Sequence, residues 1–136
     1  MSWLLVRARD RAVAFALDDV LEVVRTVAMV EPSLSRWRGR FGRFDWRGAL
    51  VPACELSVRL DGARPRPLGE YVDGHIVIVA TATATVGFVV ERAETIVDEI
   101  ESGARLRPAA LLGVRERQRA AAASASSSSI GGGGAR

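Results

Sequence analysis

The chain contains no lysine: all nineteen basic residues among its 136 are arginine. The number of arginines is therefore a weak guide to function, and their distribution along the chain is more informative. No apolar run approaches the roughly 18 residues that a membrane-spanning helix needs, and the first dozen residues carry charges unlike a signal peptide. We therefore expect a soluble intracellular protein.

Residues that commonly carry chemistry are also scarce. The single cysteine, Cys54, cannot form an internal disulfide and lies in an apolar run, which predicts a packed thiol. The single histidine, His75, stands at the start of the strongest predicted strand, where a general base has no nucleophile beside it. There is no glycine-rich phosphate loop before a helix. The acidic residues between Glu91 and Glu101 have the spacing of a solvated face, so we expect no enzyme, metal site or cofactor.

Length and composition predict one domain with a tail. About half of the residues are apolar, enough for a hydrophobic core. Residues 120–136 are almost entirely alanine, serine and glycine, which predicts a disordered tail after a domain of residues 1–119. A loop rich in proline and glycine within residues 61–74 is expected to divide the domain into two β-rich halves.

Short apolar runs bounded by turn residues predict a mainly β fold. Trp3–Ala8 and Arg11–Leu17 are expected to form one hairpin, and His75–Thr81 and Thr85–Val90 another. Two segments fit either class of secondary structure. The segment after Asp18 has the apolar spacing of a short helix with Asp18 as its N-cap, but its valines also fit a strand from Val23 to Val30. Glu91–Ile100 has helical spacing, although Ile96 and Val97 also suit a strand.

The stretch from Gly42 to Leu56 is the most distinctive in the chain. Ala49–Leu56 predicts a buried strand, with Pro52 at a bend or at the edge of a sheet because proline has no N–H to donate. Residues 36–47 contain five arginines and only one acid, Asp45. Three of these arginines alternate with Phe41, Phe44 and Trp46, so we expect an exposed loop suited to contact with a partner.

These residues resemble a known motif. Gly42, Asp45, Arg47, Gly48, Val51, Pro52 and Leu56 match the G-x-x-N-x-R-G-x-x-x-P-x-x-x-L signature of CheW-like domains, except that Asp45 replaces asparagine. Asp19–Val23 is similar to the short V-x-E element of that family, and residues 75–100 are similar to its apolar strand pair and continuation. The resemblance extends from Trp3 to Val114.

The resemblance implies two small SH3-like β-barrels with short helices, and a non-catalytic adaptor of bacterial chemotaxis. It implies two partners, the regulatory domain of a CheA-like histidine kinase and the cytoplasmic tip of a chemoreceptor. Members of the family carry a final strand and helix after the position of Val114, so we expect the second barrel either to be closed differently or to be incomplete. The protein would be cytoplasmic, associated with the membrane through receptor arrays rather than by direct insertion.

Partner-binding residues are carried over from the same resemblance. Matching the family motif places Val20, Glu22, Gly42, Asp45, Arg47 and Gly48 at or beside the partner-binding surface. Arg47 and Glu22 match an arginine and a glutamate that lie together in the family. Asp45 would offer Arg43 or Arg47 an ion pair.

Three alternatives stay open. Arginines alternating with aromatic residues also suit a small basic barrel that binds single-stranded nucleic acid, although no nucleic acid is expected on the main interpretation. The chain would otherwise be a degenerate adaptor outside any signalling array, or the basic segment would be an ordinary solvent-exposed loop.

Overall fold

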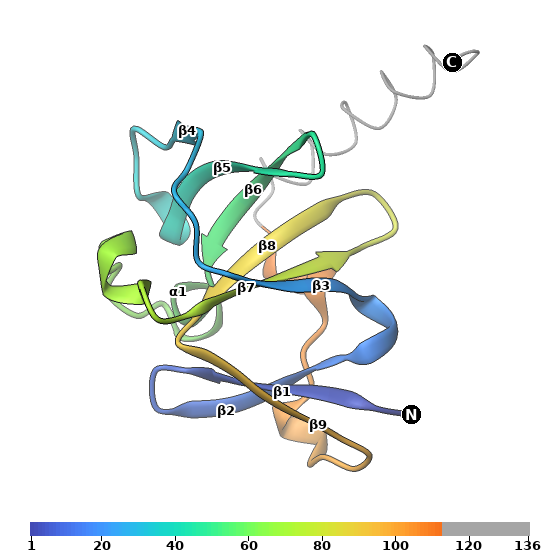
Figure 1. The fold of residues 1–136 in the computed structure, drawn as a ribbon. Coiled ribbons are helices and arrows are strands. Elements are labelled where there is room, and N and C mark those ends of the chain that lie inside the picture. The colour runs from blue at the N-terminus through green and yellow to red at the C-terminus, as the bar shows by residue number, and fades with distance from the viewer. Residues whose placement is uncertain (113–136) are drawn as a thin grey trace, which may run out of the picture.

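A computed structural model describes residues 1–112, which form a mainly β fold with two sheets and short helices (Figure 1). This confirms the predicted fold class. The strands are β1 (Trp3–Ala8), β2 (Arg11–Ala16), β3 (Val20–Arg25), β4 (Glu31–Pro32), β5 (Arg40–Trp46), β6 (Ala49–Glu55), β7 (His75–Ala80), β8 (Thr85–Val90) and β9 (Arg92–Val97). The helical segments are η1 (Leu17–Asp19), η2 (Trp37–Gly39), α1 (Leu56–Asp61), η3 (Leu68–Tyr71), η4 (Ser102–Ala104) and η5 (Pro108–Leu111).

The smaller sheet has the strand order β2-β1-β9 and is antiparallel throughout. Its β1–β2 hairpin is the one that the sequence predicts. Arg9, in the turn, has a φ of 59°, a left-handed conformation that reverses the chain in two residues. The outer edge of β2 meets the later chain at Ala14, which bridges Arg105.

The larger sheet has the order β3-β7-β8-β6-β5-β4. It curls so far that Glu22 on β3 is bonded to Trp46 on β5, and we call this curled sheet the barrel. Its first and last strands, β3 and β4, are consecutive in the chain, so the segment between them crosses from one edge of the sheet to the other (Figure 1). Backbone bonds from Val30 N to Arg43 O (2.8 Å) and from Ser33 N to Phe41 O (2.9 Å) extend the β4–β5 pairing on both sides. Pro52 lies just before the residues of β6 that pair with β8, which begin at Ala53. The missing N–H of Pro52 therefore costs the β6–β8 ladder nothing.

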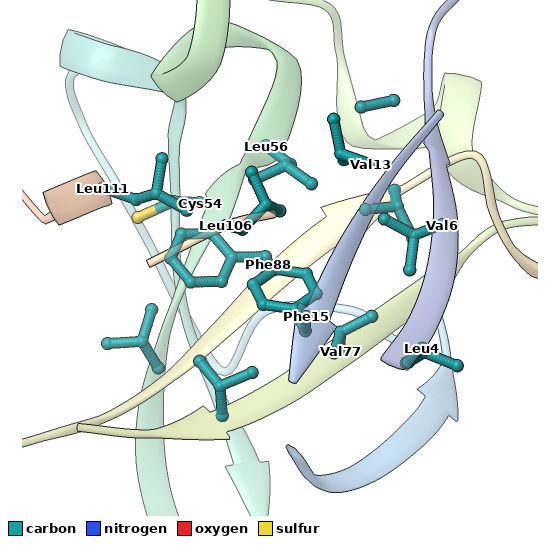
Figure 2. Packing of buried hydrophobic residues seen from close by; sticks show 14 of the residues in the cluster. Leu4, Val6, Val13, Phe15, Cys54, Leu56, Val77, Phe88, Leu106 and Leu111 are labelled. Atoms are coloured by element: carbon teal, nitrogen blue, oxygen red, sulfur yellow. The ribbon is translucent and has the colours of Figure 1, made fainter. Parts of the chain in front are cut away.

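The central strands of this sheet are buried on both faces, which explains their unbroken apolar runs. In β7, Val77 and Val79 contribute to one core cluster, whereas Ile76 and Ile78 contribute to another. The first core lies against the β1–β2 hairpin, where the rings of Phe15 and Phe88 stack 5.7 Å apart (Figure 2). The second core fills the barrel. One sheet thus joins both hydrophobic cores.

Two segments with helical spacing are strands. The helix expected after Asp18 is wrong: Asp18 lies inside η1, which has no side-chain cap, and the chain enters β3 at Val20. The alternative, a strand from Val23 to Val30, is confirmed as a strand, but β3 begins earlier, at Val20, and ends earlier, at Arg25. Likewise the segment Glu91–Ile100 contains strand β9, Arg92–Val97, rather than a helix. In both segments, β-branched residues favour a strand that a neighbouring strand can pair with. Strand β3 pairs with β7 and β9 pairs with β1, and this pairing outweighs the helical spacing of the apolar residues.

The exposed loop expected before the Ala49 strand, where arginines alternate with aromatic residues, is wrong except at Arg47 and Gly48. Residues 40–46 form β5, and Phe41 and Phe44 are only 6 % and 1 % exposed in the core of the barrel. In a regular strand, residues three apart face opposite sides, but the register shift between Arg40 and Gly42 turns Phe41 to the same core as Phe44. Most of the segment that the sequence predicted to be a contact loop is therefore a strand with one face in the core.

Strands from both sides of residues 61–74 contribute to each sheet, so the sheets do not follow the division expected there. The tail expected at residues 120–136, and the position after Val114 where the family carries a final strand and helix, lie outside the described residues. Within residues 1–112, no helix is long and apolar enough to cross a membrane.

Candidate functional site

The tip of the β5–β6 hairpin carries the motif arginine. Trp46 pairs with Ala49, which leaves Arg47 and Gly48 as a two-residue loop with φ values of 52° and 82°. Positive φ at both positions is the signature of a type I′ turn, which suits the twist of a hairpin. Asparagine or glycine is usual at the first position, and arginine there costs roughly 1 kcal/mol. Arg47 is therefore an exposed arginine in a strained conformation, and the backbone of Arg9 in the β1–β2 turn is strained in the same way.

Asp45 supports this turn. Its Oδ1 accepts a hydrogen bond from the Gly48 N–H at 2.9 Å. The ion pair expected between Asp45 and Arg43 or Arg47 is absent from the described contacts, because Arg43 pairs with Glu31 and Arg47 with another acid. An asparagine oxygen accepts the same bond, so the aspartate preserves the turn despite the change from the family motif.

Glu22 and Arg47 lie together, as the resemblance implies. Glu22 Oε1 accepts a hydrogen bond from Trp46 Nε1 at 2.8 Å and forms an ion pair with Arg47 Nη2 at 3.2 Å. The guanidinium of Arg47 lies 5.1 Å from the centre of the Trp46 ring. The side chains of Arg47 and Glu22 are 71 % and 37 % exposed. An ion pair this exposed contributes less than about 1 kcal/mol to the stability of the fold.

The two remaining motif positions hold the fold. Val20 pairs with Val79 and is partly buried against the first core. Gly42 has a φ of 135°, and a Cβ there would lie 2.2 Å from the carbonyl oxygen of Glu31. Of the six predicted positions, the structure brings Glu22, Asp45, Arg47 and Gly48 to one surface and places Val20 and Gly42 in packing roles.

Sequence reasoning missed a buried carboxylate. Glu55, at the end of β6, is fully buried and accepts hydrogen bonds from the backbone N–H of Arg66 (3.1 Å), from Arg36 Nη2 (3.1 Å) and from Arg9 Nη2 (3.2 Å). The hydroxyl of Tyr71 donates a further bond to it. Arg9, Arg36 and Arg66 come from three segments far apart in the chain. The one local signal is an acid inside the apolar run from Ala53 to Leu56.

Arg66 extends this network. Its Nη2 forms an ion pair with Glu91 at 2.6 Å and donates to the Tyr71 hydroxyl at 3.0 Å. Burial, followed by the hydrogen bond to Glu55, raises the pKa of the Tyr71 hydroxyl. The tyrosine therefore stays protonated and acts as a donor to the carboxylate. We call Arg9, Arg36, Glu55, Arg66 and Tyr71 the Glu55 network.

The lone histidine and cysteine have structural positions. His75 is the first residue of β7, and its Nδ1 accepts a hydrogen bond from the Ala93 N–H at 3.1 Å. Cys54 is buried in the first core, 3.1 Å from Arg59 Nη2. Both agree with the sequence interpretation. Within residues 1–112, no three His, Cys, Asp or Glu side chains are grouped to hold a metal ion.

The basis for nucleic-acid binding is weaker in the structure than in the sequence. Phe41 and Phe44 are buried, and the indole N–H of Trp46 is bonded to Glu22. Two of the three aromatic residues expected to stack on bases are therefore inaccessible.

The fold and the site together define a class: a small domain of two β-sheets that presents a charged hairpin tip beside an exposed acid. Comparison with protein families assigns it further. The model of the CheW-like domain matches residues 2–121, so the chain belongs to the CheW-like domain family. No curated protein matches the chain.

A solved structure shares the fold. The crystal structure of the scaffolding protein TtCheW from Thermoanaerobacter tengcongensis superposes with a TM-score of 0.60 at 22 % sequence identity. The match covers 75 % of this chain but only 63 % of that one. The chain therefore spans less than two thirds of the length of the scaffolding protein that it resembles.

Proposed function

We propose that this protein is a non-catalytic signalling adaptor of the chemotaxis type, which couples chemoreceptors to a CheA-like histidine kinase by protein–protein binding. Membership of the CheW-like family supports the adaptor role. The observation that carries the site is the Glu22–Trp46–Arg47 cluster: an exposed arginine, held in a strained turn and aligned by an acid from another strand. Such an arrangement has a clear use in orienting a partner and little use in folding.

The mechanism proposed is binding alone. The planar guanidinium of Arg47 is positioned by Glu22 on one side and the Trp46 ring on the other, so little side-chain entropy is lost when a partner carboxylate binds. The cationic group sets the orientation of the partner, and apolar surface around it supplies affinity. The regulatory domain of the kinase and the cytoplasmic tip of the receptor are the proposed partners.

The test is binding of the full chain to a purified kinase regulatory domain and, separately, to a receptor cytoplasmic fragment, measured by calorimetry. We expect Arg47→Ala to weaken at least one of these affinities more than about tenfold, the loss typical of a charged contact at an interface. The melting temperature should change little, because the Arg47 side chain is mostly exposed. Arg43→Ala is the matched control, an exposed arginine of the same hairpin that pairs with Glu31.

Unchanged affinity together with a collapse in melting temperature would show that Arg47 is structural. Failure of the wild-type chain to bind either partner would instead support a degenerate adaptor.

A further inference from the structure

The barrel carries a groove outside the Glu22–Trp46–Arg47 cluster. It has a volume of about 660 Å³, and its apolar walls include Met29, Pro32, Phe41, Pro67 and Leu68. Phe41 lies near the start of β5, whereas Trp46 ends it. Five residues of strand at about 3.3 Å each separate the groove from the hairpin tip by about 16 Å. The two surfaces are therefore at opposite ends of one strand.

The charged residues that line this groove are basic. Residues 33–40 and 62–68, which include part of the lining, contain five arginines and no acid. Two of these, Arg36 and Arg66, line the groove directly. Glu55 and Glu91 pair with these two arginines, so the excess of positive charge in the two segments comes from Arg38, Arg40 and Arg64. The groove thus combines an apolar floor with a cationic rim.

The rim is preorganised. The guanidinium of Arg36 lies 3.9 Å from the centre of the Phe41 ring, and that of Arg66 lies 4.8 Å from the centre of the Tyr71 ring. Both guanidiniums also bind Glu55, so their positions are fixed from the buried side. Pro67 has a φ of −62° and a ψ of 151°, the polyproline II conformation, which keeps the adjoining wall extended. Rigid walls reduce the entropy lost on binding.

We propose that this groove binds a short, extended, acidic segment of a partner protein. One or two apolar side chains of the segment occupy the groove, and its carboxylates lie against the arginines of residues 33–40 and 62–68. The volume is within the range of pockets that take small ligands, which matches a few side chains rather than a folded domain. Charge complementarity selects an acidic partner over a neutral one. This goes beyond the proposed function, since it involves neither Glu22 nor Arg47.

The test uses the full chain alone and a fluorescein-labelled peptide in which a Leu-Phe pair is flanked by glutamates. We expect saturable binding by fluorescence anisotropy that weakens as salt is raised. Pro67→Glu adds a negative charge to an exposed position on the groove wall and should weaken binding about fivefold or more. Ile96→Glu adds the same charge to an exposed position on β9, in the other sheet, and should change affinity less than about twofold. Circular dichroism checks that both variants are folded.

Three results would overturn the proposal. Equal binding of a peptide with glutamine in place of glutamate would remove the role of charge. Equal loss of affinity in the Pro67→Glu and Ile96→Glu variants would mean non-specific attraction to a basic protein. Dimerisation in sedimentation, abolished by Pro67→Glu, would mean that a second copy of the chain covers the groove.

Discussion

Replacing Glu55 with glutamine should strongly destabilise the fold although the change is conservative in shape. The carboxylate is fully buried and accepts from two guanidiniums, a backbone N–H and a tyrosine hydroxyl. An amide keeps the shape but loses the charge and turns an NH₂ group toward donors. Removing one partner of a buried ion pair costs about 3–5 kcal/mol.

The expected loss falls at the lower end of that range. The arginine side chains around Glu55 are 25 % to 33 % exposed, so water compensates part of their lost pairing. We therefore expect Glu55→Gln to lower the free energy of unfolding by about 3 kcal/mol. With a urea m-value of about 1.5 kcal/mol/M, the unfolding midpoint falls by about 2 M.

Urea unfolding followed by circular dichroism measures this, with Glu31→Gln as the matched control. Glu31 pairs with Arg43 on the surface, where both side chains are about half exposed, and its loss should cost less than about 0.5 kcal/mol. If the two variants unfold at the same midpoint, the Glu55 network does not stabilise the fold and this reasoning is refuted.

Three further predictions concern individual positions. Gly42→Ala should lower the free energy of unfolding by about 3 kcal/mol or more, because the new Cβ would lie 2.2 Å from a backbone oxygen. Gly48→Ala, whose Cβ would have open space around it, should lower it by about 1 kcal/mol. Thermal unfolding of the two variants tests this difference. Burial, aided by nearby arginines, lowers the pKa of His75, so the unfolded chain binds a proton more readily than the folded one. Stability should therefore be greatest above about pH 6.5 and fall as the pH drops below it, and a His75→Asn variant should lose that dependence. Trp46→Phe should keep an aromatic ring but lose the 2.8 Å hydrogen bond to Glu22, which should lower the free energy of unfolding by about 1 kcal/mol. An unchanged melting temperature would contradict this prediction.

The candidate site was accessible from the sequence only in part. The Arg-Gly step before an apolar strand marks a tight turn, and the motif resemblance points to Glu22 as a companion of Arg47. That these two side chains meet depends on closure of the barrel, which brings β3 against the β5–β6 hairpin. For the aromatic residues of β5, the sequence pattern predicted exposure where the structure shows burial. Their alternation with arginine looks like a mixed contact surface, but Phe41 and Phe44 are both buried, because a register shift at the start of β5 lets residues three apart face the same core.

Local patterns determined the mainly β class, the two hairpins, the packed thiol and the strand start at His75, because short apolar runs and turn residues act over a few positions. Tertiary structure decided what depends on distant partners. Glu55 is bound by an arginine 46 residues earlier and another 19 residues earlier, and no local pattern specifies such contacts. Distant partners also decided the structure of β3 and β9. Both have apolar residues at helical spacing, but both are strands because they pair with strands far along the chain. A buried charge is stabilised only by the groups that surround it in the folded protein, so its role becomes visible only there.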